Sequence, residues 1–222
     1  FKIVDFVMRF APYGVFGAVA AVIAVKGLGI LGGYLYLIIT FFFTLIFFIS
    51  IVLWLICLVA KIPYWKLLAQ VKDALILSFS TASSEASMPL QIEKLKEFGI
   101  SERIVSFVLP LGYSFNLDGS MMYMTFAVGF IAQAYGIELT AYQQVIMMLT
   151  LLITSKGIAG VPRASLVVIA GTMSLFNLPA EGLILLFAVD WLLDMGRSAT
   201  SVAGNAVATA IVAKWEGELD MA

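Results

Sequence analysis

Apolar residues form long runs along this chain, and short polar stretches separate them. Residues 28–60 contain no charged side chain, and a helix needs only about 20 apolar residues to cross a bilayer. This run predicts a transmembrane helix that is tilted or slightly too long. A helix is also predicted over residues 1–25, an amphipathic segment suited to the membrane interface over 61–73, and an apolar span over 104–135. The pattern as a whole predicts an all-α polytopic membrane protein.

The last predicted helix, residues 190–213, differs from the others because polar side chains recur along it at intervals of three and four. At 100° per residue they fall within roughly 80° of arc, so they share one face of the helix. The other positions are apolar or small. Burying two carboxylates and a guanidinium in a membrane is expensive, and such groups mark functional sites. The sequence therefore predicts a site along this polar stripe, which comprises Asp190, Asp194, Arg197, Ser201 and Asn205.

Lysine and arginine are unevenly shared among the connecting segments. Residues 61–73 and 91–103 both carry them, so both segments are expected on the cytoplasmic side. Residues 74–90 lie between the two and have a polar centre, and they must therefore start and end on the same side. This arrangement predicts a re-entrant hairpin whose tip lies at residues 81–87.

The two remaining connections, residues 136–142 and 177–182, contain neither lysine nor arginine and are expected outside the cell. Residues 143–176 therefore also return to the side from which they start, with a tip at residues 157–163. Two hairpins that enter from opposite faces, each followed by one full span, form an inverted repeat. Non-helical backbone at membrane depth is tolerated where it lines a buried site or cavity, so both tips are expected to point at the polar stripe.

The span over residues 104–135 is interrupted at residues 112–120, where two glycines permit the backbone to unwind. Unwound carbonyl groups beside Asn116 and Asp118 are hard oxygen ligands, which suit a cation such as Na⁺. A kinked helix with one satisfied carboxylate is the alternative. The position of Asp118 in the middle of the span, facing the same region as the stripe, favours a cation site.

The tips and the stripe offer groups that suit an acidic substrate. Ser84 and its neighbours supply hydroxyls, and free N–H groups at short helix ends favour an anionic group. Arg197 can bind a carboxylate through two hydrogen bonds, and Asp194, one turn earlier, can accept an ammonium. A helix cap beside a solvated Glu85 is the structural alternative for the tip. For Arg197 the alternative is a structural bridge to Asp190 or Asp194.

Composition narrows the possible functions. Hydrophobic residues make up 62% and charged residues 12% of the chain, against about 25% charged residues in soluble domains, and the mean hydropathy is +1.05. The net charge of −1 does not suggest a nucleic-acid partner. Because the chain has no histidine, zinc–histidine sites and Ser–His or Cys–His catalytic pairs are excluded. The single cysteine, Cys57, excludes an internal disulfide.

Four stretches resemble, in this order, motifs of the dicarboxylate/amino acid:cation symporters, the glutamate transporter family: SFSTASSEASMP, LPLGYSFNLDGS, SKGIAGVPRAS and LDMGRSATSVAGNAVATAIVAKWEGE. The resemblance covers essentially all 222 residues. It implies secondary active transport by alternating access across the cell (plasma or inner) membrane. It also implies that roughly the N-terminal half of a family chain, with much of a scaffold that forms a homotrimer, is missing here.

The chain starts at Phe1 rather than at a methionine, and it is expected to be the C-terminal piece of a longer protein. Residues 1–60 are interpreted as two transmembrane helices, which belong partly to the scaffold and partly to the transport core. Residues 61–135 are expected to hold the hairpin that enters from the cytoplasm and the broken helix. Residues 136–214 are expected to hold the hairpin that enters from outside and the last helix, and residues 215–222 a cytoplasmic tail.

The resemblance also implies two sets of site residues. Substrate contacts would come from Ser84, Ser120, Val161, Ser165, Asp194, Arg197, Ser198 and Ser201. Cation sites would use the main-chain carbonyls of Gly112, Ser114, Asn116, Ser155, Lys156, Ile158 and Ser201, and the side chains of Asn116, Asp118 and Asn205. In the family, arginine at the Arg197 position accompanies acidic substrates, and aspartate at the Asp194 position holds an amino group. Both residues therefore favour aspartate or glutamate as the substrate.

Two positions depart from the family pattern. Sodium-coupled members have aspartate where this chain has Asn205, so one cation site loses its carboxylate, and the proton-coupled bacterial branch carries asparagine there. Ser201 stands where asparagine is usual, which shortens a group that touches both substrate and ion. The coupling ion is therefore expected to be Na⁺, H⁺ or both, and no other cofactor is implied.

The sequence therefore predicts a symporter that couples uptake of aspartate or glutamate to a cation gradient, with the substrate, the ions and membrane lipid as its partners. A C4-dicarboxylate symporter is the alternative. An intramembrane aspartyl protease is a rival from another class, but such an enzyme needs two carboxylates brought together, and Asp194 already has a cationic neighbour. An ion channel is a second rival, although a saturable site that contains Arg197 suits conduction poorly.

Overall fold

The computed structural model describes residues 13–220, except residues 15, 18, 25–26 and 157–161. Within these residues the chain folds as helices, and the only strand-like pairing is an isolated bridge between Ile100 and Leu219. The helix predicted over residues 1–25 falls mostly outside the described part of the chain. The all-α class that the apolar runs predict is confirmed.

The longest apolar run forms one continuous helix, made of α2 (Ile30–Phe47), the π-helical segment η1 (Phe48–Val52) and α3 (Leu53–Val59). Among the described residues, it is the one helix that is long and apolar enough to cross a membrane. Only 17% of its most apolar window is buried inside the protein. Most of its apolar side chains therefore face outward, as expected of a helix in contact with lipid or with a further protein segment.

The first helical hairpin joins α5 (Lys72–Thr81) to α6 (Ser84–Glu97) and follows the short helix α4 (Tyr64–Gln70). Ala82 turns the chain with a left-handed φ of 50°. Ser83 then caps α6, because its side chain accepts a hydrogen bond from an N–H group in the first turn. The tip therefore consists of two residues, and the tip predicted over residues 81–87 is too wide because its second half is the first turn of α6.

A break separates α7 (Glu102–Phe115) from α8 (Asp118–Ala134), which together form the span predicted over residues 104–135. Only Asn116 and Leu117 lie outside the helices, with ψ angles of 70° and 58°. The break is narrower than the predicted interruption. The reason is that α7 keeps its hydrogen-bond ladder to its end, where the Asn116 N–H donates to the carbonyl of Gly112 at 2.7 Å.

The second helical hairpin consists of α9 (Ala141–Thr154) and α10 (Ala164–Met173). A capping box between Thr140 and Gln143 fixes the start of α9. The short helices η2 (Ser174–Phe176) and α11 (Gly182–Phe187) follow. Of the tip predicted at residues 157–163, only the last two residues lie within the described part of the chain.

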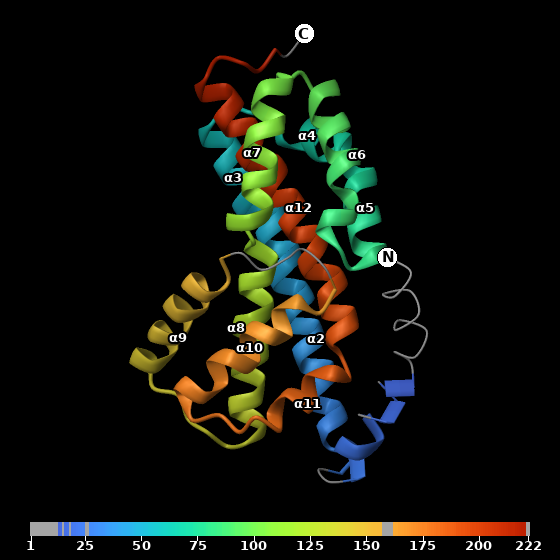
Figure 1. Cartoon of the computed structure of the whole chain (residues 1–222), viewed down its shortest axis with the longest axis vertical. Coiled ribbons are helices and arrows are strands. Elements are labelled where there is room, and N and C mark those ends of the chain that lie inside the picture. Colours follow the sequence, from blue (N-terminus) through green and yellow to red (C-terminus); the bar gives the residue numbers. More distant parts are fainter. Residues whose placement is uncertain (1–12, 15, 18, 25–26, 157–161, 221–222) are drawn as a thin grey trace.

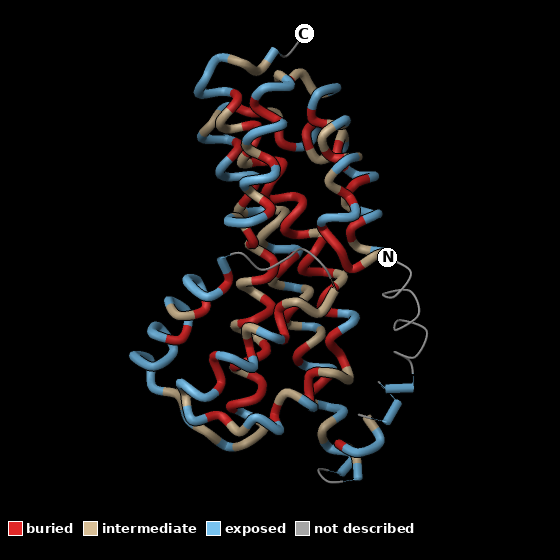
Figure 2. The backbone as a smooth tube through the Cα atoms, viewed as in Figure 1, coloured by how far each residue is buried: buried red, intermediate tan, exposed pale blue. Residues whose placement is uncertain are grey.

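The last helix, α12 (Asp190–Trp215), begins at the residue that the polar stripe predicts. It contacts α2, α5, α6, α7 and α8 and forms the axis of the molecule (Figure 1). The α5–α6 hairpin descends from the upper end in Figure 1, and the α9–α10 hairpin rises from the lower end. The described ends of both hairpins approach the middle of α12, which Figure 2 shows as buried.

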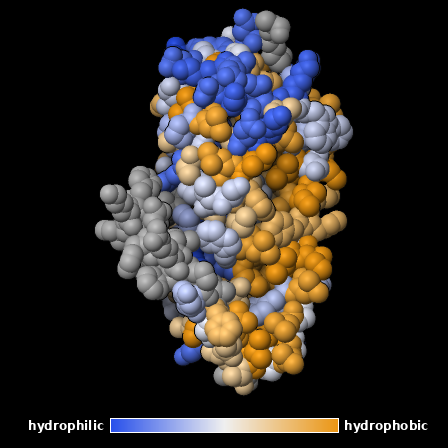
Figure 3. All heavy atoms as spheres, turned by 90° about the vertical axis from the view of Figure 1, so that its right-hand side faces the viewer, coloured by the Kyte–Doolittle hydropathy of each residue, from blue (hydrophilic) through white to orange (hydrophobic). Residues whose placement is uncertain are grey.

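Two hydrophobic clusters pack against α12, one around each half. The first cluster reaches Leu193 and the second begins at Val202, so the polar residues between them lie where the two cores meet. Hydrophilic residues gather at one end of the surface in Figure 3, and apolar residues cover much of the remainder of that face. The same end holds three ion pairs, which are Lys94–Glu97, Lys96–Glu102 and Arg103–Glu218.

Candidate functional site

The polar stripe of α12 faces the interior along its whole length. Its five side chains are all buried, although they include two aspartates and an arginine: Asp190, Asp194, Arg197, Ser201 and Asn205. Charged groups are almost never fully buried unless they have partners. The hydrogen-bond and ion-pair partners of these buried side chains are therefore described first. Buried polar atoms that have no partner in the protein then indicate what this region can bind.

Arg197 is the largest fully buried side chain of the molecule among the described residues. Its Nε donates to the Oδ1 of Asp194, one turn earlier on the same helix. Its Nη1 donates to the hydroxyl of Ser120 on α8 at 2.8 Å. The structural bridge that the sequence left open is thus present, and it runs to Asp194 rather than to Asp190.

The second hairpin also reaches the stripe through Arg163. Its main-chain N–H donates to the Oδ2 of Asp194 at 2.9 Å, so both oxygens of that carboxylate are engaged. Its side-chain Nε lies 3.4 Å from the Oδ2 of Asp190, whose Oδ1 accepts a hydrogen bond of 2.5 Å from the hydroxyl of Tyr123. The tip, α8 and α12 are therefore linked by one network of charged hydrogen bonds and ion pairs.

Apart from the two atoms of the Arg163–Asp190 ion pair, four buried polar atoms around this network have no hydrogen-bond partner within the described part of the chain. They are the hydroxyl oxygens of Ser165, Ser198 and Ser201 and the Nδ2 of Asn205. Leaving a buried polar group unsatisfied costs about 1–3 kcal/mol, so a cluster of them requires an explanation. A polar ligand in their midst would supply the missing partners, and three of the four residues lie on α12.

The break between α7 and α8 faces the C-terminal part of the same stripe. The Nδ2 of Asn116 donates to the Oδ1 of Asn205 at 3.0 Å. Close packing requires glycine at two positions here, because a Cβ on Gly112 would meet the Asn205 amide and one on Gly204 would meet the Asp118 carboxylate. The structure thus brings together the three side chains that the family resemblance assigns to a cation site.

The remaining predicted residues fall into three groups. Ser84 and Ser155 are buried near the two hairpin tips. Ser114 and Lys156 are exposed, and the Lys156 ammonium donates to the carbonyl of Phe115 at 2.6 Å. Two predicted residues, Ile158 and Val161, lie outside the described residues.

Three polar contacts were not predicted from the sequence. Arg163 belongs to the predicted tip of the second hairpin, but its partners, Asp190 and Asp194, lie about 30 residues later in the sequence. Tyr123 is compatible with an apolar span, so nothing in the pattern sets it apart. Gln91 links three helices, since its Oε1 accepts from the Tyr113 hydroxyl at 2.5 Å and its Nε2 donates to the carbonyl of Val202 at 2.9 Å.

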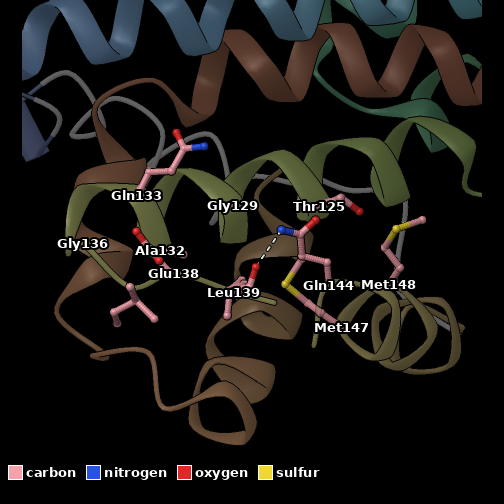
Figure 4. Close-up of a pocket in the computed structure, with 11 residues that line it drawn as sticks. Thr125, Gly129, Ala132, Gln133, Gly136, Glu138, Leu139, Gln144, Met147 and Met148 are labelled. Carbon is pink, nitrogen blue, oxygen red and sulfur yellow. Dashed lines mark hydrogen bonds between the residues drawn. The ribbon is translucent and has the colours of Figure 1, made fainter. Parts of the chain in front are cut away.

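A separate pocket of about 650 Å³ lies between α8 and α9 (Figure 4). Among the described residues that line it, Glu138 alone is charged, and Gln144 lies across the pocket with its Nε2 donating to the carbonyl of Leu139 at 2.9 Å. None of the lining residues belongs to α12. The pocket is therefore distinct from the network around the polar stripe, and its described lining residues offer no cation for an anionic ligand.

The chain is similar in sequence to several curated transporters. A proton/glutamate-aspartate symporter of Escherichia coli (strain K12) is 46% identical over 99% of this chain and 50% of its own length. A proton/sodium-glutamate symport protein of Bacillus subtilis (strain 168) is 42% identical over 98% of this chain and 51% of its own. A C4-dicarboxylate transport protein of Cupriavidus taiwanensis is 43% identical over 99% of this chain and 51% of its own.

The chain spans about half the length of the curated relatives it matches. These relatives are named as transporters, so the protease considered as a rival is not supported. Residues 1–215 match the sodium:dicarboxylate symporter family, which is nearly the whole chain. The chain belongs to the sodium:dicarboxylate symporter family.

Proposed function

We propose that the protein is a multi-pass transporter of the cell membrane that couples uptake of aspartate or glutamate to Na⁺, H⁺ or both. The single observation that carries this proposal is the set of unpartnered buried hydroxyls beside the Arg197–Asp194 pair. The names of the relatives, which include glutamate and aspartate symporters, support the class of substrate. Assembly as a homotrimer is part of the proposal.

The proposed binding site lies between the two helical hairpins. Arg197 would bind a substrate carboxylate, since a buried guanidinium pairs with a carboxylate in a fixed geometry. Asp194 would accept the ammonium, and Ser165, Ser198 and Ser201 would offer hydroxyls to the second carboxylate. Ser84, Ser120 and Val161 complete the proposed set. The cation would lie at the α7–α8 break, with the Asn116, Asp118 and Asn205 side chains and the carbonyls assigned above.

The hairpins would act as two gates related by an inverted repeat, one in residues 61–135 and one in residues 136–214. Their approach to the middle of α12 from opposite ends supports this proposal (Figure 1). If both hairpins are re-entrant, a cysteine at Lys72 and one at Lys94 should react with a membrane-impermeant thiol reagent from the cytoplasmic side. Cysteines at Gly136 and Glu181 should react from the outside.

This labelling uses the full-length protein in cells, with Cys57 replaced by serine so that each introduced thiol is the only one in this part of the chain. The two positions that flank one hairpin serve as controls for each other. Labelling of the Lys72 and Lys94 positions from opposite sides would mean that residues 74–90 cross the bilayer. The proposed inner gate would then be wrong.

A C4-dicarboxylate such as succinate is the second candidate substrate, and one contact favours it. Both oxygens of Asp194 are already engaged, by Arg197 and by the Arg163 main chain, which leaves this carboxylate less available for an ammonium. Uptake of radiolabelled aspartate and succinate into proteoliposomes, with and without a Na⁺ or H⁺ gradient, tests both. Uptake of neither under any gradient would refute the proposed function.

A further inference from the structure

Lys156 places a fixed positive charge at the broken helix. It follows the end of α9 in the second hairpin, and its ammonium donates to the carbonyl of Phe115, the last residue of α7, at 2.6 Å. The last carbonyls of a helix have no partner within the helix and carry its negative dipole end. A cation is favoured there, and in this chain a side chain supplies it.

The other groups at the break leave little negative charge for a dissolved ion. The position opposite Asn116 holds the neutral amide of Asn205, whose Oδ1 already accepts a hydrogen bond from the Asn116 Nδ2. Among the described residues, Asp118 is the carboxylate next to the break, at the first position of α8. An added Na⁺ would therefore compete with the Lys156 ammonium for the carbonyl oxygens at the end of α7.

We infer that Lys156 is a tethered cation that takes the place of one coupling Na⁺ at the α7–α8 break. The inference rests on the proposed transport function and identifies a residue that determines its ion dependence. Lys156 follows directly after the end of α9, so the charge at the break comes from the second helical hairpin.

The test removes the charge and keeps the length of the side chain. In the purified full-length protein, the Lys156→Met variant should bind aspartate roughly tenfold more weakly than the wild type in choline buffer without Na⁺. That is the effect of losing one hydrogen bond to a charged group. Addition of 100 mM Na⁺ should restore most of this affinity in Lys156→Met and change the affinity of the wild type much less. Lys156→Arg is the matched control, which keeps the charge and should behave as the wild type.

A second measurement does not involve the substrate. Titration calorimetry with NaCl should give a larger Na⁺-binding heat for Lys156→Met than for the wild type and for Lys156→Arg. Addition of Asn205→Asp to Lys156→Met should strengthen that binding, because a carboxylate is a better Na⁺ ligand than an amide. If Lys156→Met is poorly folded, Lys156→Gln takes its place in the same comparison.

The outcomes separate the inference from the proposed function. An identical Na⁺ response in Lys156→Met and the wild type, in both measurements, would overturn the tethered cation and leave the transport function standing. Failure of the wild type to bind aspartate or succinate in any salt would overturn the proposed function, and the inference with it. Loss of binding in Lys156→Met that Na⁺ does not restore would show a structural role only and would also overturn the inference.

Discussion

Replacing Arg197 by cysteine is expected to abolish the binding of acidic substrates by the full-length protein. The guanidinium is 1% exposed and donates to both Asp194 and Ser120. Its loss would leave the carboxylate of a bound substrate without the guanidinium that pairs with it. Truncating one partner of a buried, hydrogen-bonded charge pair costs about 2–5 kcal/mol, and even the lower value weakens binding roughly thirtyfold.

The measurement is the affinity for aspartate and for succinate, determined with detergent-purified wild type and variant. Arg163→Gln is the matched control, because Arg163 also lies beside a stripe carboxylate, but its side chain is 30% exposed and its Nε makes an ion pair at 3.4 Å without a hydrogen bond. The control should lose less affinity than Arg197→Cys. Unchanged affinity in Arg197→Cys, in a protein that elutes as the wild type does, would remove Arg197 from the site.

The sequence predicted those helices whose pattern is visible within a single segment of the chain. The polar stripe recurs every three or four residues, so it predicted a helix that starts at Asp190 and buries one face, and both features are observed. The charge-free run predicted the helix Ile30–Val59 for a similar reason. These predictions required only the geometry of a single helix.

The exact ends of the non-helical segments depend on local hydrogen bonds. The sequence alone did not show which of the possible hydrogen bonds would form. Serine at position 83 is equally compatible with a loop and with an N-cap, and the structure uses it as a cap. This choice shortens the first tip to two residues. The break beside Asp118 is likewise narrower than predicted, because Gly112 remains helical where its freedom to unwind was expected to be used.

Partners in the site could not be predicted because they join residues that lie far apart in sequence. Arg197 could pair with Asp194, one turn earlier on the helix, or with Asp190, two turns earlier, and the choice of Asp194 is accompanied by the contact of Arg163 with Asp190. The Tyr123 hydroxyl lies on another helix. Long-range contacts of this kind follow from tertiary packing, whereas the stripe itself follows from one helix.

Substituting alanine for Gly119 is expected to disrupt the site, whereas the same substitution ten residues later on α8 should be tolerated. A Cβ on Gly119 would collide with the main-chain carbonyl of Arg197, and neither backbone can yield without separating α8 from α12. Overpacking of this kind typically costs about 1–3 kcal/mol. It would also pull Ser120 away from the Arg197 guanidinium, to which it is bound at 2.8 Å, so substrate affinity should fall together with stability.

Gly129 provides the matched control, because a Cβ there would meet nothing within 4 Å among the described residues. Alanine in the interior of a helix is favoured over glycine by about 1 kcal/mol, so Gly129→Ala should leave the melting temperature unchanged or raise it. Thermal unfolding of the purified full-length variants, followed by aspartate binding, measures both effects. Equal melting temperatures and equal affinities for Gly119→Ala and Gly129→Ala would contradict the contact between the start of α8 and α12 on which the proposed site depends.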